Sequence, residues 1–297
     1  MRNKSNLLRF VKIVFVVLFM IILINTSAIS DNRKDLFLNL QQRLIADGFD
    51  KTMINKIYNK PEIYFDVDSV SGYFRHSEAR LNYDQFKNNY NINNACKYIK
   101  NHYKFLNDTE EKYGVDKEII TAIMLVETRL GTYTGKGRVI NIFSTMAALK
   151  DKTVRDILWD QIPKKSRISR KKYDSKANSK SGWSYSELKD FIRYTAREKI
   201  DPVSIRGSYA GAIGIAQFIP SSIISYAKDG NHDGKIDLFN HEDAIVSIAN
   251  YVKNFGWKPG ISKKKAFKVL YYYNRSKYYV NTLLDVSKIL KKRSCKN

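Results

Sequence analysis

The sequence predicts a mostly helical protein. Apolar residues recur at helical spacing through most of the chain from Asp35 onward. Proline, glycine and short polar runs separate these segments, as expected for helices joined by turns. Residues 31–297 are enough for one large or two modest domains with a hydrophobic core.

Residues 1–30 have the pattern of a secretory signal peptide. Basic residues precede the apolar run 13–24, and small residues follow it. The run is short for a bilayer span, which needs about 20 residues. An uncleaved membrane anchor is the alternative, whereas a lipoprotein anchor is excluded because the segment contains no cysteine.

The net charge of +23 suits a polyanionic partner, such as nucleic acid, anionic lipid or a cell wall that carries peptide carboxylates. A solvated surface in a lysine-rich composition is the alternative. The export signal argues against a nucleic-acid partner. Cys96 and Cys295 could pair in an oxidising compartment or remain free thiols, and no Cys/His cluster has zinc spacing.

The first expected helices are 35–49 and 52–58, which end before Pro61. One or two helices follow in 77–113, with an Asn-rich break near 88–94.

The next helix, 116–131, carries the first candidate for chemistry. Asp116 is a good N-cap and Gly131 a natural stop. Glu127 falls on the same stripe as the apolar residues Ile119, Ile120, Ile123 and Met124. Burial there, with the negative end of the helix dipole nearby, would raise the pKa of Glu127 and suit it to act as a general acid. Alternatively, Glu127 pairs with an arginine such as Arg129 and completes the helix.

Helices are expected at 141–160 and 186–199, on either side of a Lys- and Arg-rich stretch, 163–182. We interpret 163–182 as an exposed basic loop, either solvated or binding an anionic partner. The Gly-rich run 207–222 has mostly small side chains, so a ligand or another helix can lie close to its backbone. Gln217 offers a hydrogen-bond donor and acceptors there. Pro220 is placed to begin a new helix.

Residues 229–243 match the first half of an EF-hand calcium loop. Asp229, Asn231, Asp233 and the backbone of Lys235 have the required spacing. Asn240 occupies the position of the usual closing glutamate, so Asp243 is the candidate closing ligand. A polar turn without a metal is the alternative, and in either case the loop should be structural.

The remaining expected helices are 244–255, 266–273 and 280–290. Between the last two, Y-Y-Y-N-R-S-K-Y-Y-V combines aromatic rings with Asn and Arg. Aromatic rings stack on sugar faces while amides bind hydroxyl groups, although single-stranded nucleic acid would suit the same residues.

Taken together, V-E-T-R-L-G at 126–131, G-S-Y-A-G-A-I-G-I-A-Q-F-I-P-S-S at 207–222, the 229–243 loop, A-N-Y and Y-N-R-S-K-Y-Y resemble the lytic murein transglycosylase B family. The resemblance runs from about Asp35 to Leu290. It implies a lysozyme-like helical core with accessory helices, a small strand element and an EF-hand-like loop. It also implies cleavage of the bond between N-acetylmuramic acid and N-acetylglucosamine, with a 1,6-anhydro product.

The resemblance carries over site residues as well. It implies Glu127 as the single catalytic acid and base. It implies a glycan groove lined by Ser208, Gln217, Tyr251, Tyr273, Asn274 and Tyr279. It implies a structural calcium site formed by Asp229, Asn231, Asp233, Lys235 and Asp243.

We therefore expect a monomeric, exported enzyme in the periplasm, acting on peptidoglycan glycan strands, with no nucleic-acid partner and no cofactor for catalysis. A tether to the inner membrane through the N-terminus is possible. The alternatives are a muramidase on the same scaffold and a non-catalytic peptidoglycan-binding protein. Two departures from the family are the basic stretch 163–182 and the segment after Asn141, which lacks an expected Arg and Pro pattern.

Overall fold

The computed structural model describes residues 35–75 and 81–295, so the expected signal peptide at 1–30 lies outside the described residues. The prediction of a mostly helical chain is confirmed. The elements are η1 (Asp35–Phe37), α2 (Leu38–Ala46), α3 (Lys51–Tyr58), α4 (Val67–Arg75), η3 (Tyr83–Lys87), α5 (Asn89–Asn101), α6 (Tyr103–Tyr113), α7 (Lys117–Thr128), β1 (Gly137–Arg138), α8 (Val139–Ala148), α9 (Lys152–Gln161), η4 (Lys164–Ser166), α10 (Arg170–Arg197), β2 (Arg206–Gly207), α11 (Pro220–Tyr226), α12 (His241–Asn254), α13 (Lys263–Tyr273) and α14 (Lys277–Arg293). None of the described helices has the length and apolar character needed to cross a membrane.

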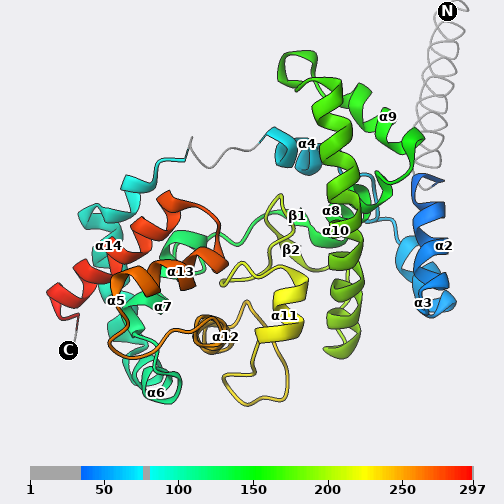
Figure 1. Cartoon of the computed structure of the whole chain (residues 1–297). Helices are drawn as coiled ribbons and strands as arrows, with labels where there is room; N and C mark the ends of the chain where they lie inside the picture. Colours follow the sequence, from blue (N-terminus) through cyan, green and yellow to red (C-terminus); the bar gives the residue numbers. More distant parts are fainter. Residues whose placement is uncertain (1–34, 76–80, 296–297) are drawn as a thin grey trace, which may run out of the picture.

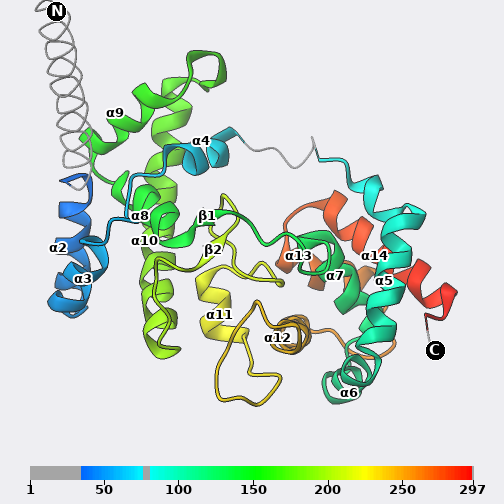
Figure 2. The same ribbon diagram turned by 180° about the vertical axis from the view of Figure 1, so that it is seen from behind.

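The helices form two groups on either side of the small strand element (Figure 1). In the first group α10 packs against α8, and α2, α3, α4 and α9 lie around this pair. In the second group α7 packs between α5 and α14, with α6, α12 and α13 alongside. The view from behind shows β1, β2 and α11 in the space between the groups (Figure 2).

The strand element holds the Gly-rich segment at the junction of the two groups. β1 and β2 are antiparallel, with Gly137 opposite Gly207, and further bridges pair Gly207 with Ile213 and Ile213 with Phe218. A Cβ atom at Gly207 would lie 2.2 Å from the carbonyl oxygen of Ala212, so only glycine fits here. The segment after β2 is therefore folded into a tight, fixed turn.

The prediction of an exposed basic loop at 163–182 is wrong for most of this stretch, because α10 begins at Arg170. Tyr173, Ala177 and Ser181 are buried at four-residue intervals, which gives the helix one narrow inward face. The lysines and arginines occupy the remaining faces, and these residues have good helix propensity. The short helix η4 lies in the part of the stretch before α10.

Two other expected boundaries are also wrong, both because a polar side chain begins a helix. Instead of breaking the chain, Asn88 caps α5 by accepting a hydrogen bond from the backbone N–H of Asn91 (2.9 Å). The single helix expected at 141–160 is divided where Asp151 accepts a hydrogen bond from the N–H of Thr153 (2.8 Å) and begins α9. Short polar side chains favour such caps over helix interiors.

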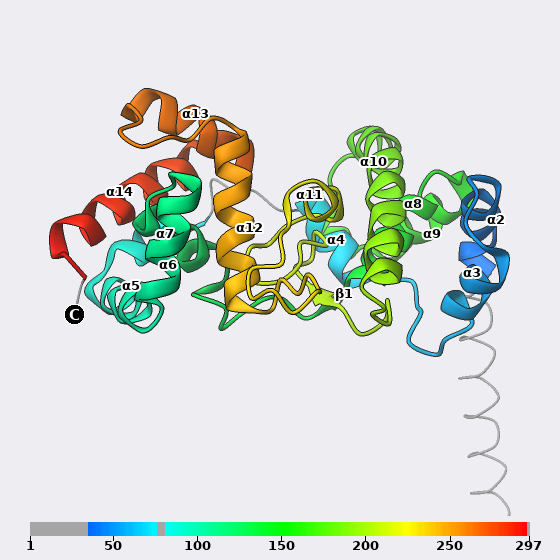
Figure 3. The same cartoon turned by 90° about the horizontal axis from the view of Figure 1, so that it is seen from below.

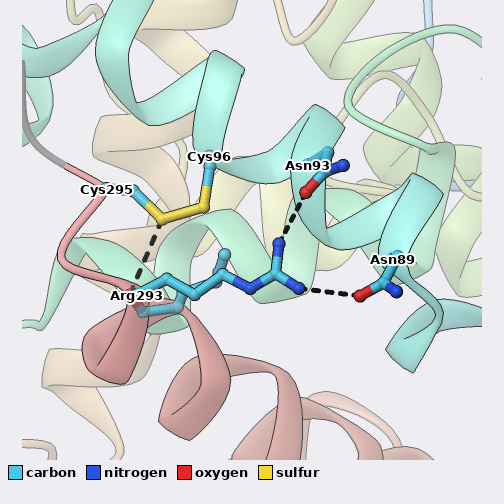
Figure 4. The surroundings of a disulfide bond; sticks show 6 residues. Asn89, Asn93, Cys96, Arg293 and Cys295 are labelled. Atoms are coloured by element: carbon cyan, nitrogen blue, oxygen red, sulfur yellow. Dashed lines mark hydrogen bonds between the residues drawn. A yellow bond between two sulfur atoms is a disulfide. The ribbon is translucent and has the colours of Figure 1, made fainter.

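Cys96 and Cys295 form a disulfide, which settles the alternative left open by the sequence (Figure 4). Next to it, Arg293 donates hydrogen bonds to the side-chain oxygens of Asn89 (2.8 Å) and Asn93 (2.5 Å). These contacts tie the end of α14 to α5. A disulfide of this kind is typical of an oxidising, extracytoplasmic compartment.

We expect Cys295→Ser to lower the free energy of unfolding by about 4–5 kcal/mol, because the bond closes a loop of 199 residues and so restricts the unfolded chain. Urea unfolding followed by far-UV circular dichroism measures this change. A reducing agent should destabilise the wild type to the level of the variant and leave the variant unchanged. Equal stability of the oxidised and reduced wild type would contradict the prediction.

Candidate active site

Glu127 lies in the last turn of α7, the central helix of the second group. The apolar stripe predicted for this helix is confirmed, since Ile119, Ile120, Ile123 and Met124 are all fully buried. Glu127 itself is half-buried. The burial of α7 thus brings a carboxylate to the edge of the core, as the spacing predicts.

Both ends of α7 differ in detail from the prediction. Asp116 precedes the helix but makes no side-chain cap; its carboxylate accepts a hydrogen bond from Trp257 Nε1 (3.0 Å) and forms an ion pair with Lys291 on α14. At the other end the helix stops before Gly131, because Arg129 and Leu130 already have left-handed φ angles of 50° and 61°. Arg129 donates a hydrogen bond to Gln85 (2.8 Å).

Thr128 connects the end of α7 to the Gly-rich segment. Its hydroxyl lies 3.1 Å from the carbonyl oxygen of Ile215 and 3.3 Å from that of Met124, and it accepts a hydrogen bond from the N–H of Gly131 (3.0 Å). This role was not predicted from the sequence. The position of Thr128 directly after the acid is the signal that could have identified it.

Tyr279, on α14, is the direct partner of Glu127. Its hydroxyl donates a hydrogen bond to Glu127 Oε1 at 2.5 Å. Burial of the Tyr279 side chain, reinforced by the charge of Glu127, raises the pKa of Tyr279 well above its ordinary value. Tyr279 therefore keeps its proton and acts as a donor. Tyr83 packs edge-on against the Tyr279 ring (6.4 Å between centroids) and was also missed from the sequence.

Two further predicted groove residues continue from Tyr279 as a row of rings. Tyr273 stacks on Tyr279 (6.4 Å), and Tyr251 meets Tyr273 edge-on (4.9 Å). Tyr273 donates its hydroxyl to the carbonyl oxygen of Ala216 (2.6 Å), and Tyr251 donates to that of Tyr272 (2.9 Å). Burial raises the pKa of Tyr251 to about 12. The hydroxyl groups of both residues thus hold the backbone around the site.

Gln217 follows two residues that contact the surroundings of Glu127. Ile215 contacts Thr128, which follows the acid, and Ala216 contacts Tyr273. Gln217 has a left-handed φ of 50°, and its amide donates to the carbonyl oxygens of Gly214 (2.8 Å) and Thr134 (3.2 Å). The side-chain amide of Gln217 is therefore held by backbone carbonyl groups of the Gly-rich segment and of the segment before β1.

The other two predicted groove residues lie on the adjoining turns. Ser208 accepts hydrogen bonds from the N–H groups of Ala210 (3.3 Å) and Ala212 (3.1 Å), so its hydroxyl shapes the turn after β2. Asn274 follows Tyr273 at the end of α13 and is half-buried. Ser208 thus directly follows β2, and Asn274 directly follows α13.

A second buried carboxylate, Glu187 on α10, has a structural role. It accepts hydrogen bonds from the N–H and hydroxyl of Ser221 (2.9 Å each) and so stabilises the start of α11. Burial raises the pKa of Glu187. Because it is engaged with α11, it is not a second acid for Glu127.

The predicted calcium loop is folded around its own backbone. Asp229 accepts hydrogen bonds from the N–H groups of Asp233 (3.2 Å) and Gly234 (2.9 Å). Buried Asp243 accepts from the N–H groups of Gly230 (2.8 Å) and Asp237 (2.7 Å), which closes the loop at the position predicted for the last ligand. Oxygen donors of the kind that calcium prefers thus line one loop.

A separate acidic group lies at the start of α7, where oxygens of Glu110, Asp116 and Glu118 come within 4.8 Å of one another. Glu110 pairs with Lys117, and Asp116 has the partners described above. This group was not predicted from the sequence. An ion can be held by such a cluster, although exposed acidic groups without an ion are common.

Comparisons with known proteins agree with this architecture. The family model described as "Transglycosylase SLT domain" matches residues 32–264. Membrane-bound lytic murein transglycosylase B of Escherichia coli (strain K12) is 35% identical over 170 residues, which are 57% of this chain and 40% of that protein. The match therefore spans less than half of the length of this relative.

Solved structures share the fold. The soluble lytic transglycosylase SltB1 from Pseudomonas aeruginosa has a TM-score of 0.69 and 23% identity, covering 86% of this chain and 98% of that one. SltB3 from P. aeruginosa, in complex with NAG-NAM-pentapeptide, has a TM-score of 0.67 and 18% identity, with 87% and 78% covered. E. coli Slt35, in complex with calcium, has a TM-score of 0.62 and 20% identity, with 89% and 93% covered.

The expected fold class, mostly helical with a small strand element, is confirmed by these matches. The family model covers most of the chain, and its matched range includes Glu127. This protein belongs to the transglycosylase SLT domain family.

Proposed function

We propose that this protein is a lytic transglycosylase that cleaves peptidoglycan glycan strands, with Glu127 as both acid and base. The contact between Tyr279 and Glu127 Oε1 is the observation that carries the proposal. It fixes one half-buried carboxyl group beside the row of tyrosines and the Gly-rich turn. A carboxyl group held in this way can exchange a proton with a bound sugar.

The reaction follows from having one carboxyl group rather than two. Glu127 protonates the glycosidic oxygen between N-acetylmuramic acid and N-acetylglucosamine, and the C1–O bond breaks. The acetamido group of the substrate stabilises the positive charge at C1. The C6 hydroxyl then attacks C1 and gives its proton to Glu127, which closes the 1,6-anhydro ring and restores the acid. A usual glycosidase requires a second carboxylate, and the buried acid Glu187 is committed to the start of α11.

The neighbouring residues would position the sugar. Gln217 is rigidly placed and can bind a hydroxyl or acetamido group, while Ser208 and Asn274 border the same region. The half-buried ring of Tyr273 can offer an apolar surface to a sugar, whereas buried Tyr279 acts through its hydroxyl on Glu127. Positioning of this kind can contribute several kcal/mol to the lowering of the barrier.

Mass spectrometry of muropeptides released from purified peptidoglycan tests the proposal. The mature protein should release anhydro-ended products, and Glu127→Gln should release none. Glu187→Gln serves as a control, since a folded variant at that position should keep the same products.

Reducing-ended products would instead identify a muramidase. No release by either protein, with binding to peptidoglycan retained, would identify a non-catalytic binding protein.

The role of Tyr279 can be measured separately by a double-mutant cycle with Glu127→Ala and Tyr279→Phe. Because a hydrogen bond to a charged group is lost in each single variant, we expect a coupling energy of about 1.5–3 kcal/mol in urea unfolding.

The control is a second double-mutant cycle, in which Tyr251→Phe takes the place of Tyr279→Phe. The hydroxyl of Tyr251 donates a hydrogen bond to the carbonyl oxygen of Tyr272. This coupling should stay within about 0.5 kcal/mol. Equal coupling in the two cycles would show that Tyr279 supports Glu127 only through packing.

We also propose that the loop 229–243 binds a structural calcium ion. Asp229, Asn231, Asp233 and Asp243 would supply side-chain oxygens, and Lys235 its carbonyl oxygen. The backbone already curls around these groups, and the E. coli protein of the same fold was crystallised with calcium. The ion would stabilise the turn that precedes α12.

Melting temperatures in calcium and in chelator test this site. We expect calcium to raise the melting temperature of the wild type, since a ligand at 100 times its Kd stabilises a protein by about 2.7 kcal/mol. Asp233→Ala should melt lower than the wild type in calcium and equally in chelator. Asp285→Ala, which removes an exposed carboxylate on α14, should respond to calcium as the wild type does. Equal melting of Asp233→Ala and wild type in calcium would contradict the assignment.

We propose a periplasmic location, with export directed by residues 1–30 and a tether to the inner membrane if this segment is not cleaved. The disulfide and the membrane-bound E. coli relative support this proposal. Peptidoglycan is then the polyanionic partner that the basic chain meets.

A further inference from the structure

The outward face of α13 carries a groove that the catalytic proposal does not use. The groove is lined by Phe267, Lys268, Tyr271, Tyr272, Arg275 and Lys277 and has a volume of about 710 Å³. Its first four residues share one face of α13, since they are spaced by about one helical turn. Figure 3 shows α13 on the outside of the second helical group. We call this feature the α13 groove.

The rings in the α13 groove are exposed yet ordered by stacking. Tyr271 is 37% exposed and Tyr272 is 58% exposed. Phe267 stacks on Tyr271 with 6.1 Å between centroids, and Tyr272 stacks on Phe255 at 4.7 Å. Clustered exposed aromatic residues of this kind mark interaction sites on soluble proteins. Flat rings with polar hydroxyl groups suit sugar rings in particular.

The charges of the α13 groove are all positive. Lys268, Arg275 and Lys277 line it, and no carboxylate is among the lining residues. Within residues 35–75 and 81–295, none of these three cations forms an ion pair. They are therefore available to an anionic ligand, and carboxylates would complement them.

We propose that the α13 groove is a second binding site for a peptidoglycan strand, separate from the cleavage site. Sugar rings would lie on Tyr271 and Tyr272, and carboxylates of the stem peptides would meet Lys268, Arg275 and Lys277. The proposal rests on the proposed function, because it takes peptidoglycan as the substrate. Tyr273 and Asn274 follow Tyr272 directly, so a strand held in the groove is kept beside the catalytic site. Such a site would favour long, insoluble substrate by raising its local concentration.

Co-sedimentation with purified, insoluble peptidoglycan tests the groove in the Glu127→Gln background, where binding is not obscured by cleavage. The double variant Lys268→Ala/Tyr271→Ala should bind about tenfold more weakly, because it loses one charge and one ring. The control is Tyr90→Ala/Lys97→Ala on α5, which removes a ring that is 69% exposed and one exposed lysine. Circular dichroism melting verifies that both variants are folded.

Cleavage assays complete the test and use the same groove substitutions in a protein that keeps Glu127. The groove variant should cleave a soluble tetrasaccharide at the wild-type rate and insoluble peptidoglycan more slowly. If the groove variant bound insoluble peptidoglycan as tightly as the control variant, the proposal would be overturned. Unchanged binding to peptidoglycan with lost binding to phosphatidylglycerol vesicles would overturn it in favour of a membrane surface. If the wild type releases no muropeptides, the proposed function fails, while the sedimentation result still decides whether the groove binds strands.

Discussion

The hydrogen bond from Tyr279 to Glu127 is the interaction on which the candidate site depends. It joins residues that are 152 positions apart, so it forms only when α7 and α14 are packed together. A carboxyl group at the edge of the core needs a partner there, because burying an unsatisfied polar group is costly. Tyr279 supplies a neutral donor that stays protonated beside the acid. The same contact thus satisfies the acid and fixes its position.

The surrounding structure holds α14 in the place that this hydrogen bond requires. At the end of α14, Cys295 is bonded to Cys96 on α5. Nearer the start of α7, Asp116 is paired with Lys291 of α14 and bonded to Trp257. α14 is therefore held by a covalent link to α5 and by an ion pair with the residue that precedes α7. Exposed ion pairs contribute little each, so the apolar stripe of α7 and the disulfide dominate this anchoring.

The sequence was sufficient to predict the features that depend on residues close together in the chain. The helical spacing of Ile120, Ile123 and Glu127 predicts the buried stripe and the acid at its edge, and both are observed. The close backbone approach at Gly207 also follows from its motif. The start of α10 was missed because its inward face has few large apolar residues, so the lysines dominate the pattern. The contacts of Thr128 and the pairing of the cysteines depend on residues distant in sequence, which spacing cannot reveal.

The end of α13 illustrates how one short run of tyrosines can serve two tasks. Successive residues of a helix point about 100° apart, so neighbours in the run face different surroundings. Tyr273 faces inward, where its hydroxyl holds Ala216 and its ring stacks on Tyr279. Tyr271 and Tyr272 face outward, where lysines and an arginine surround them. A sequence pattern that favours sugar binding throughout thus separates, in the fold, into a framework for the acid and an exposed surface. Tyr273 is constrained by a hydrogen bond and ring contacts within the core, whereas each outward ring stacks on one aromatic neighbour and keeps an exposed surface.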